Sequence, residues 1–238
     1  MTDGPDDTFH TDNAVAATAE LIDDAARDRL VLVGPDAGAY LQSQISQEVR
    51  DLEVGAARWT LVLDPTGKVE VLARLRRSTD DTYELDTDAG FGAAMEARLR
   101  RFMIRVAIET EFHDAAAAEP SDEVESRRVE AGWPRMGREI VSGTTIPATT
   151  GVVPMSVNFA KGCYPGQELV ERMDSRGADA PKRLRVVEVD DAALAGDPVV
   201  VDGVEVGTLT SVSPTASLAI ASVKRGVDVG RSPMHLAV

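Results

Sequence analysis

The chain has 238 residues, with 40 acidic and 25 basic side chains, a formal charge of -15 and a pI near 4.6. This negative charge disfavours sequence-independent binding to nucleic acid or to anionic lipid, because both attract Lys and Arg. No apolar run approaches the roughly 18 residues of a membrane span, so we expect a soluble globular protein of one large or two small domains.

The first predicted elements are a lead-in, a helix and a strand. Residues 1–13 are acidic and polar, unlike a targeting peptide, so we predict a disordered lead-in and a cytoplasmic protein. Residues 15–28 are rich in Ala and predict a helix, and Arg29–Gly34 is a short apolar run that predicts a buried strand. The next apolar residues recur at helical spacing and predict one buried helix face: Ala37, Tyr40, Leu41, Ile45 and Val49.

A β-hairpin is predicted next. Residues 59–64 and 69–75 alternate between apolar and polar side chains on either side of a Pro-Thr-Gly turn. A short strand at Tyr83–Asp86, a helix over 91–102 and a strand at Val106–Phe112 follow. This order predicts an α+β fold, with helices on one face of a largely antiparallel sheet.

The C-terminal part changes to short strands separated by turns. Residues 114–125 are charged and poor in large apolar side chains, so we predict a mobile surface loop there. An Asp-Gly pair at 202–203 lies between valine-rich runs and predicts a hairpin. We therefore expect an α+β body over 14–179 and, over 180–238, a small domain that is a β-barrel or a sandwich.

Several common catalytic motifs are absent. The sequence contains no GxGxxG, no GxxxxGK[ST], no CxxC and no HExxH, which disfavours common nucleotide-binding loops and zinc sites. With one cysteine, Cys163, no intrachain disulfide can form. We predict no metal site.

The most informative stretch is KGCYPGQELVER, residues 161–172. Its glycines and proline predict a tight turn followed by a helix entered at Pro165. A thiol near a helix N-terminus and two residues from Lys161 is favoured as thiolate, which makes Cys163 a candidate reactive residue. The alternative interpretation is that Cys163 is a small apolar residue packed in a turn.

A second candidate unit is RRVEAGWP, residues 127–134, which we predict to be a brief strand entering a turn. Glu130, flanked by Arg128, would stay ionised in a pocket and accept hydrogen bonds from an amino-pyrimidine edge. The alternative is an ordinary Arg–Glu pair on the surface.

Taken together, these segments resemble a known family. KGCYPGQE resembles the K-G-C-Y-x-G-Q-E signature of the YgfZ-type folate-binding proteins, which are relatives of the glycine cleavage aminomethyltransferase, or T-protein. RVEAGWPRMGREI resembles the R-x-E-A-G-x-P segment that precedes this signature. The opening strand and helix and the C-terminal strands also resemble the family, so the likeness covers about 29–225.

The resemblance implies a fold and a cofactor. It implies a T-protein-like, folate-binding body of ferredoxin-like subdomains around a central cavity, followed by a β-barrel. By this match Glu130 contacts the pterin ring of tetrahydrofolate, and Arg128 and Gln167 are further cofactor-binding candidates. Cys163 and Lys161 are the catalytic candidates.

Three functions remain open. The first is a tetrahydrofolate-binding protein that supports assembly or repair of iron–sulfur proteins, with transient contacts to clients or assembly proteins. The second is a folate-dependent aminomethyltransferase or demethylase. Glycine-cleavage chemistry is disfavoured, because the strand after Gly67 lacks the aspartate of those enzymes and Glu70 is its one carboxylate. The third is a partner-binding module without catalysis.

Overall fold

The computed structural model describes residues 26–116, 119–175 and 180–232. The expected lead-in and most of the expected helix over 15–28 lie outside these residues. The described residues divide into two compact units. Of these residues, the N-terminal unit contains 26–116, 135–175 and 180, and the C-terminal unit contains 119–134 and 181–232. This division differs from the expected boundary at 180, because residues 119–134 group with the later strands.

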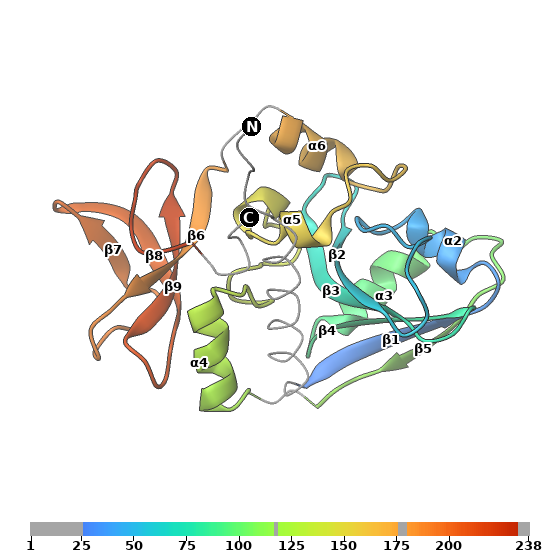
Figure 1. Cartoon of the computed structure of the whole chain (residues 1–238), viewed down its shortest axis with the longest axis horizontal. Coiled ribbons are helices and arrows are strands. Elements are labelled where there is room, and N and C mark those ends of the chain that lie inside the picture. The colour runs from blue at the N-terminus through green and yellow to red at the C-terminus, as the bar shows by residue number, and fades with distance from the viewer. Residues whose placement is uncertain (1–25, 117–118, 176–179, 233–238) are drawn as a thin grey trace, which may run out of the picture. The chain divides into compact units, whose positions relative to one another are not determined.

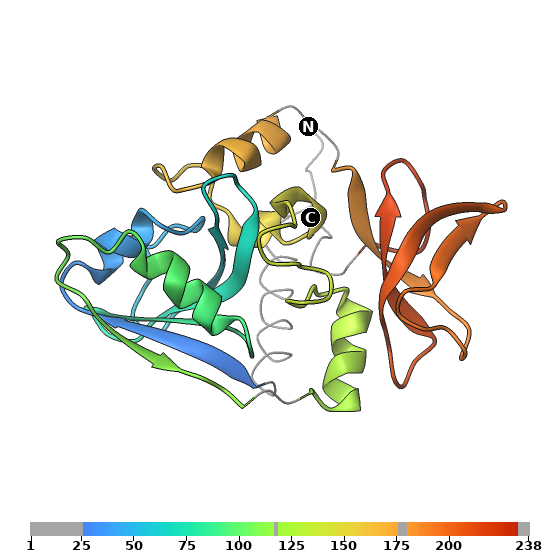
Figure 2. The same cartoon turned by 180° about the vertical axis from the view of Figure 1, so that it is seen from behind.

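The N-terminal unit is built on a five-stranded antiparallel sheet with the order β2-β3-β4-β1-β5 (Figure 1). Its strands are β1 (Arg27–Val33), β2 (Ala57–Leu63), β3 (Val69–Arg77), β4 (Thr82–Asp88) and β5 (Glu109–His113). Helices α2 (Ala37–Gln42) and α3 (Gly92–Arg100) pack on this sheet (Figure 2). The expected α+β class with an antiparallel sheet is therefore confirmed.

The core of the N-terminal unit lies between the sheet and these helices. The predicted apolar face at Ala37, Tyr40, Leu41, Ile45 and Val49 is buried. The helix itself ends at Gln42, so the prediction located the buried residues correctly but made the helix too long. Short helical turns follow later in the unit: η1 (Pro147–Thr149), α5 (Val153–Ser156) and α6 (Gln167–Ser175).

The C-terminal unit contains a four-stranded antiparallel sheet with the order β6-β9-β8-β7. The strands are β6 (Lys182–Glu188), β7 (Pro198–Val201), β8 (Val204–Val212) and β9 (Leu218–Lys224). Strands β6 and β7 end the sheet and do not pair with each other, so the sheet is not closed into the expected β-barrel. The predicted hairpin is confirmed, because Asp202 and Gly203 both have positive φ, as a two-residue turn of this type requires.

Helix α4 (Asp122–Ala131) packs against β6, β8 and β9. It corrects two expectations: residues 122–125 are not a mobile loop, and residues 127–131 are not a strand. Ser121 caps the helix by accepting a hydrogen bond from Val124 N, three acidic residues stand in its first turn, and Gly132 ends it with a left-handed φ of 69°. The apolar contact beneath it is formed by Val129, Leu184 and Ile220.

None of the described helices is long and apolar enough to cross a membrane.

Candidate functional site

The signature loop, residues 161–167, lies between helix α5 and helix α6 in the N-terminal unit. Cys163 is exposed in this loop. Helix α6 begins at Gln167, which confirms the expected helix after Pro165, but Cys163 lies four positions before the helix and outside its first turn. The thiol is accessible to other molecules, which disagrees with the interpretation of Cys163 as a packed apolar residue.

Lys161 is a buried cation with an exposed fraction of 7%. Its Nζ donates hydrogen bonds to the backbone carbonyls of Gln42 at 2.7 Å, of Ile45, and of Gln47 at 3.1 Å. These carbonyls belong to the end of α2 and the loop after it, where a cation is favourable. The ammonium also lies 5.0 Å from the centre of the Tyr164 ring. Lys161 therefore fastens the signature loop to the loop at 42–47.

Burial lowers the pKa of Lys161 from 10.5 to about 8, with Glu48 raising it and Arg50 lowering it further. The ordinary role of a lysine with such a pKa is either structural or that of a base. Here all three N–H directions have carbonyl partners, which favours the structural role.

Replacing Lys161 should destabilise the N-terminal unit. We expect Lys161→Met to lower the free energy of unfolding by about 2–3 kcal/mol, because the carbonyls lose their buried donor.

The same variant tests the pH dependence of stability. The pKa of Lys161 is lower in the folded chain than in the unfolded chain, so the unfolded chain binds more protons between about pH 8 and 10.5. Wild-type stability should therefore gain from this group as the pH rises through that window, and the variant should lack this gain. Urea unfolding at pH 7.5 and 9.5 measures both effects, and equal pH slopes would contradict the assignment.

The other end of the signature loop packs on the turn of the β2–β3 hairpin. Gly166 has a φ of 83°, and a Cβ built there would lie 2.6 Å from the carbonyl oxygen of Asp64. Gly67, in the hairpin turn, has a φ of 88°, and its Cβ would lie 2.5 Å from Cβ of Leu169. Two glycines thus permit the close approach of two turns, and Cys163 is presented between anchors on both sides.

Gln167 and Tyr164 complete the loop. The side chain of Gln167 accepts a hydrogen bond from Tyr164 N at 3.2 Å and donates one to Glu171. Tyr164 is buried, and burial raises its pKa to about 12. Its hydroxyl has no hydrogen-bond partner within the described part of the chain. Gln167, a predicted cofactor ligand, therefore has a local role in shaping the turn.

Arg98 is a second buried cation that sequence reasoning missed. Its Nε donates to the Leu63 carbonyl at 2.7 Å and its Nη1 to Gln44 Oε1 at 3.3 Å, while Phe102 lies under the guanidinium at 4.8 Å. Burial lowers its pKa. Arg98 therefore contacts the same segment, 42–47, that Lys161 fastens. Helix α3 contains two arginines, Arg98 and Arg100, and the sequence gave no signal that Arg98 is the buried one.

The second pair of predicted residues lies in the C-terminal unit, on α4. Glu130 is exposed, and its backbone carbonyl accepts a hydrogen bond from Arg231 at 2.7 Å. Arg128 is buried and binds Glu125 through Nε at 2.9 Å and Nη2 at 2.7 Å. The predicted neighbour relationship of Arg128 with Glu130 is therefore wrong: the carboxylate that Arg128 holds belongs to Glu125, one helical turn earlier.

The remaining donors of Arg128 also have protein partners. Nη1 donates to the Trp133 carbonyl at 2.6 Å and Nη2 donates to Ser211 Oγ at 2.7 Å. These two hydrogen bonds of Arg128 join α4 to the turn after it and to β8. The acidic first turn after Ser121 was a recognisable helix start, and a helix would have indicated the Glu125–Arg128 pairing at a spacing of three residues.

The two groups of predicted site residues belong to different units. Lys161, Cys163 and Gln167 share one loop of the N-terminal unit, and Glu130 and Arg128 share one helix of the C-terminal unit. Glu70 lies half-buried on β3, where it accepts a hydrogen bond from Ser142 at 3.0 Å. Within the described residues, no group of three or more His, Cys, Asp or Glu side chains is placed to hold a metal ion.

The fold of the chain is similar to folds among the solved structures. The fold resembles that of the glycine cleavage system aminomethyltransferase T from Bartonella henselae, with a TM-score of 0.70, 13% sequence identity, and coverage of 87% of this chain and 81% of that one. At this identity the likeness shows the fold, which is T-protein-like.

The chain is also similar in sequence to one curated protein. A protein of Haemophilus influenzae described as uncharacterized is 23% identical over an alignment that covers 61% of this chain. The chain spans 65% of the length of that relative. No protein-family model matches the sequence.

Proposed function

We propose that this protein binds tetrahydrofolate and supports the assembly or repair of iron–sulfur proteins. The observation that carries the folate part is the fold: a TM-score of 0.70 to an aminomethyltransferase T over most of both chains. The residues present are compatible with such a ligand. Glu130 has an exposed carboxylate with no ion-pair partner among the described side chains, so it is free to accept hydrogen bonds from a pterin ring.

The iron–sulfur part of the proposal rests on Cys163 and on the signature that contains it. The thiol is exposed and lies in a loop anchored at Lys161 and Gly166. An accessible thiol on a fixed loop can meet a second macromolecule without large rearrangement. Clusters are normally held by four thiolates, so one cysteine requires further ligands from a client protein, an assembly protein or a small thiol.

Calorimetric titration with tetrahydrofolate under anaerobic conditions tests the first part. We expect saturable binding that Glu130→Gln weakens by about tenfold, because a charged hydrogen-bond acceptor is lost. Glu123→Gln is the matched control, since Glu123 is an exposed carboxylate on the same helix. Absence of binding to the folded wild-type protein, or equal effects of both substitutions, would refute the proposed contact.

The role of Cys163 is tested in cells. We expect Cys163→Ser to lower the activity of iron–sulfur enzymes in the host while leaving tetrahydrofolate binding unchanged. Normal enzyme activities together with normal folate binding would remove the thiol from the proposal.

A folate-dependent aminomethyltransferase or demethylase is the second candidate, favoured by the same likeness to an aminomethyltransferase. Glu70 would be its proton-transfer group, and Ser142 would orient that carboxylate. Formation of 5,10-methylene-tetrahydrofolate from an aminomethyl or N-methyl donor would support this function. Failure to form it with any such donor would count against it.

A further inference from the structure

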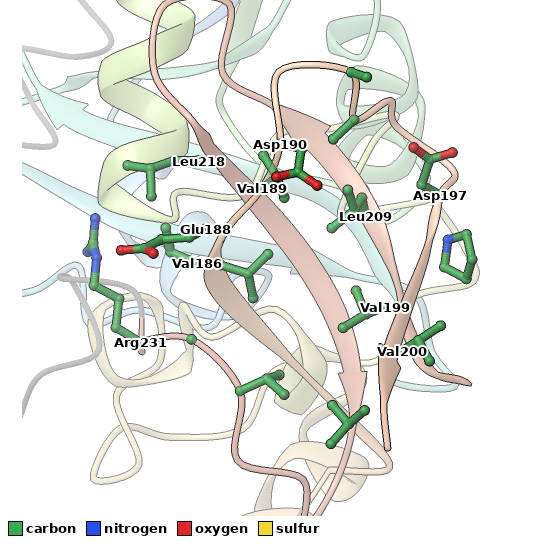
Figure 3. Close-up of a pocket in the computed structure, with 17 residues that line it drawn as sticks. Val186, Glu188, Val189, Asp190, Asp197, Val199, Val200, Leu209, Leu218 and Arg231 are labelled. Atoms are coloured by element: carbon green, nitrogen blue, oxygen red, sulfur yellow. The ribbon is translucent and has the colours of Figure 1, made fainter. Parts of the chain in front are cut away.

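The apolar core of the C-terminal unit is open on one side. A cavity of about 910 Å³ lies in this unit, bordered by β6, by β7 and by the segment at 229–231 (Figure 3). Its lining shares residues with the core cluster of the sheet: Val187, Val189, Val199, Val201, Leu209 and Val229. Because this cavity opens to solvent, its apolar side chains offer surface against which another apolar group can pack.

The cavity lies between two strand edges. In the order β6-β9-β8-β7, β6 and β7 each pair on one side with another strand of the sheet. The lining follows both strands, over residues 186–190 and 197–201. Figure 3 shows Val186 and Val189 on the β6 side and Val199 on the β7 side. A stretch of five residues in each wall is about 16 Å long at the rise of a β-strand.

The edge of β6 offers backbone groups beside the cavity. Val186 exchanges both of its backbone hydrogen bonds with Arg231, at 2.9 and 2.8 Å. Because backbone groups alternate along a strand, the N–H and C=O of Glu188 point to the same side as those of Val186. No backbone partner for Glu188 on that side is found among the described residues. An added strand can therefore bind at Glu188, as extended peptides do at other sheet edges.

The charge at the cavity is negative. Glu188, Asp190 and Asp197 contribute carboxylates to the lining, against the one guanidinium of Arg231, which donates to the Glu130 carbonyl. Asp197 accepts a hydrogen bond from Leu194 N at 2.8 Å. The carboxylates of Glu188 and Asp190 have no ion-pair partner within the described parts of the chain. A ligand with basic side chains complements this rim.

We propose that this cavity is a docking site for an extended segment of a partner protein in which apolar and basic side chains alternate. The apolar side chains enter the valine-lined cavity, and the basic ones meet Glu188 and Asp190. The backbone of the segment pairs with β6 at Glu188, beside the bridge between Val186 and Arg231. This site is independent of the proposed folate and thiol functions, because none of the catalytic or cofactor-binding candidates predicted from the sequence lines the cavity.

The test uses the full chain with methyl-labelled Val and Leu and three capped hexapeptides: alternating Arg-Val, alternating Glu-Val and alternating Arg-Ser. We expect the Arg-Val peptide to shift the methyl signals of the lining valines saturably and the other two peptides to leave them unchanged. Glu188→Gln combined with Asp190→Asn should weaken binding by about fivefold. Glu205→Gln, an exposed carboxylate of β8 outside the lining, should have no effect.

A second variant tests the apolar part. Val199→Phe fills the cavity and should abolish the methyl shifts, whereas Val204→Thr, at an exposed position outside the lining, should preserve them. Equal binding of the Arg-Ser peptide, or binding that Val199→Phe leaves intact, would overturn the proposal. Self-association of the free chain that broadens the same methyl signals would assign the cavity to a second copy. A response to benzene without a response to any peptide would assign it to a small apolar ligand. Both of these results would also overturn the proposal.

Discussion

Arg128→Met is expected to lower the free energy of unfolding of the C-terminal unit by about 3–5 kcal/mol, because it leaves the buried carboxylate of Glu125 without its cation. The pair is buried, with side-chain exposures of 8% and 11%. The variant also removes the donors to the Trp133 carbonyl and to Ser211, so the contact between α4 and β8 is weakened at the same time.

The two tryptophans allow this effect to be located. Trp133 lies in the C-terminal unit and Trp59 in the N-terminal unit. In a Trp59→Phe background, urea unfolding followed by fluorescence reports the unit that contains Arg128. Arg127→Met is the matched control. Arg127 is half-buried, and its Nη2 lies 3.8 Å from Oε1 of the exposed Glu123. We therefore expect Arg127→Met to lower the free energy of unfolding by less than about 1 kcal/mol.

The same experiment distinguishes a structural from a ligand-binding role of Arg128. Combining Arg128→Met with Glu125→Leu should recover at least about half of the lost stability, because no uncompensated charge remains. If Arg128→Met instead keeps its stability and loses tetrahydrofolate binding, the guanidinium belongs to the cofactor site and the structural assignment is wrong.

Gly166→Ala is expected to destabilise the N-terminal unit by about 2–4 kcal/mol, because the new Cβ both strains a left-handed backbone and overlaps a carbonyl oxygen. Gly166 has a φ of 83°, and a Cβ at this position would lie 2.6 Å from the carbonyl oxygen of Asp64. The same Cβ would lie 2.9 Å from Cα of Gly67, which leaves little room for the turn to move away.

Gly162→Ala is a control in the same loop. A Cβ at Gly162 would have Arg50 Nη2, at 3.9 Å, as its nearest neighbour, so a change within about 0.5 kcal/mol is expected. Fluorescence of Trp59 in a Trp133→Phe background measures both variants. Equal losses for the two alanines would show that the loop is not held against the hairpin as described.

Local sequence signals predicted the strands and turns well. The Asp202-Gly203 pair and the Pro65-Gly67 turn each specify a hairpin through backbone conformations that glycine and its neighbours favour. The apolar face at 37–49 was also predicted, because burial follows from spacing. The end of α2 at Gln42 was not, since the chain there is held by Lys161, more than one hundred residues away in the sequence.

The candidate site shows where local reasoning fails. The sequence located Cys163 and its loop, but it left open whether the thiol is reactive or packed in the turn, and the structure places it at the surface. The partners of Lys161 and Arg128 depend on contacts with separations of 119 and 83 residues, which no motif reports. The cavity beside β6 depends on which strands fail to pair, and a list of strands does not determine that.

The interleaving of the two units has a consequence for how the chain is made. Helix α4 precedes the last segment of the N-terminal unit, whereas its packing partners β6, β8 and β9 follow that segment. During synthesis α4 therefore leaves the ribosome well before Ser211, which lies 83 residues after Arg128. Until β8 and β9 emerge, Val129 lacks the apolar cover of Ile220 and Arg128 lacks one of its buried acceptors. This interval exposes the nascent chain to aggregation and to chaperones, and it makes the docking of α4 a late, non-local step of folding.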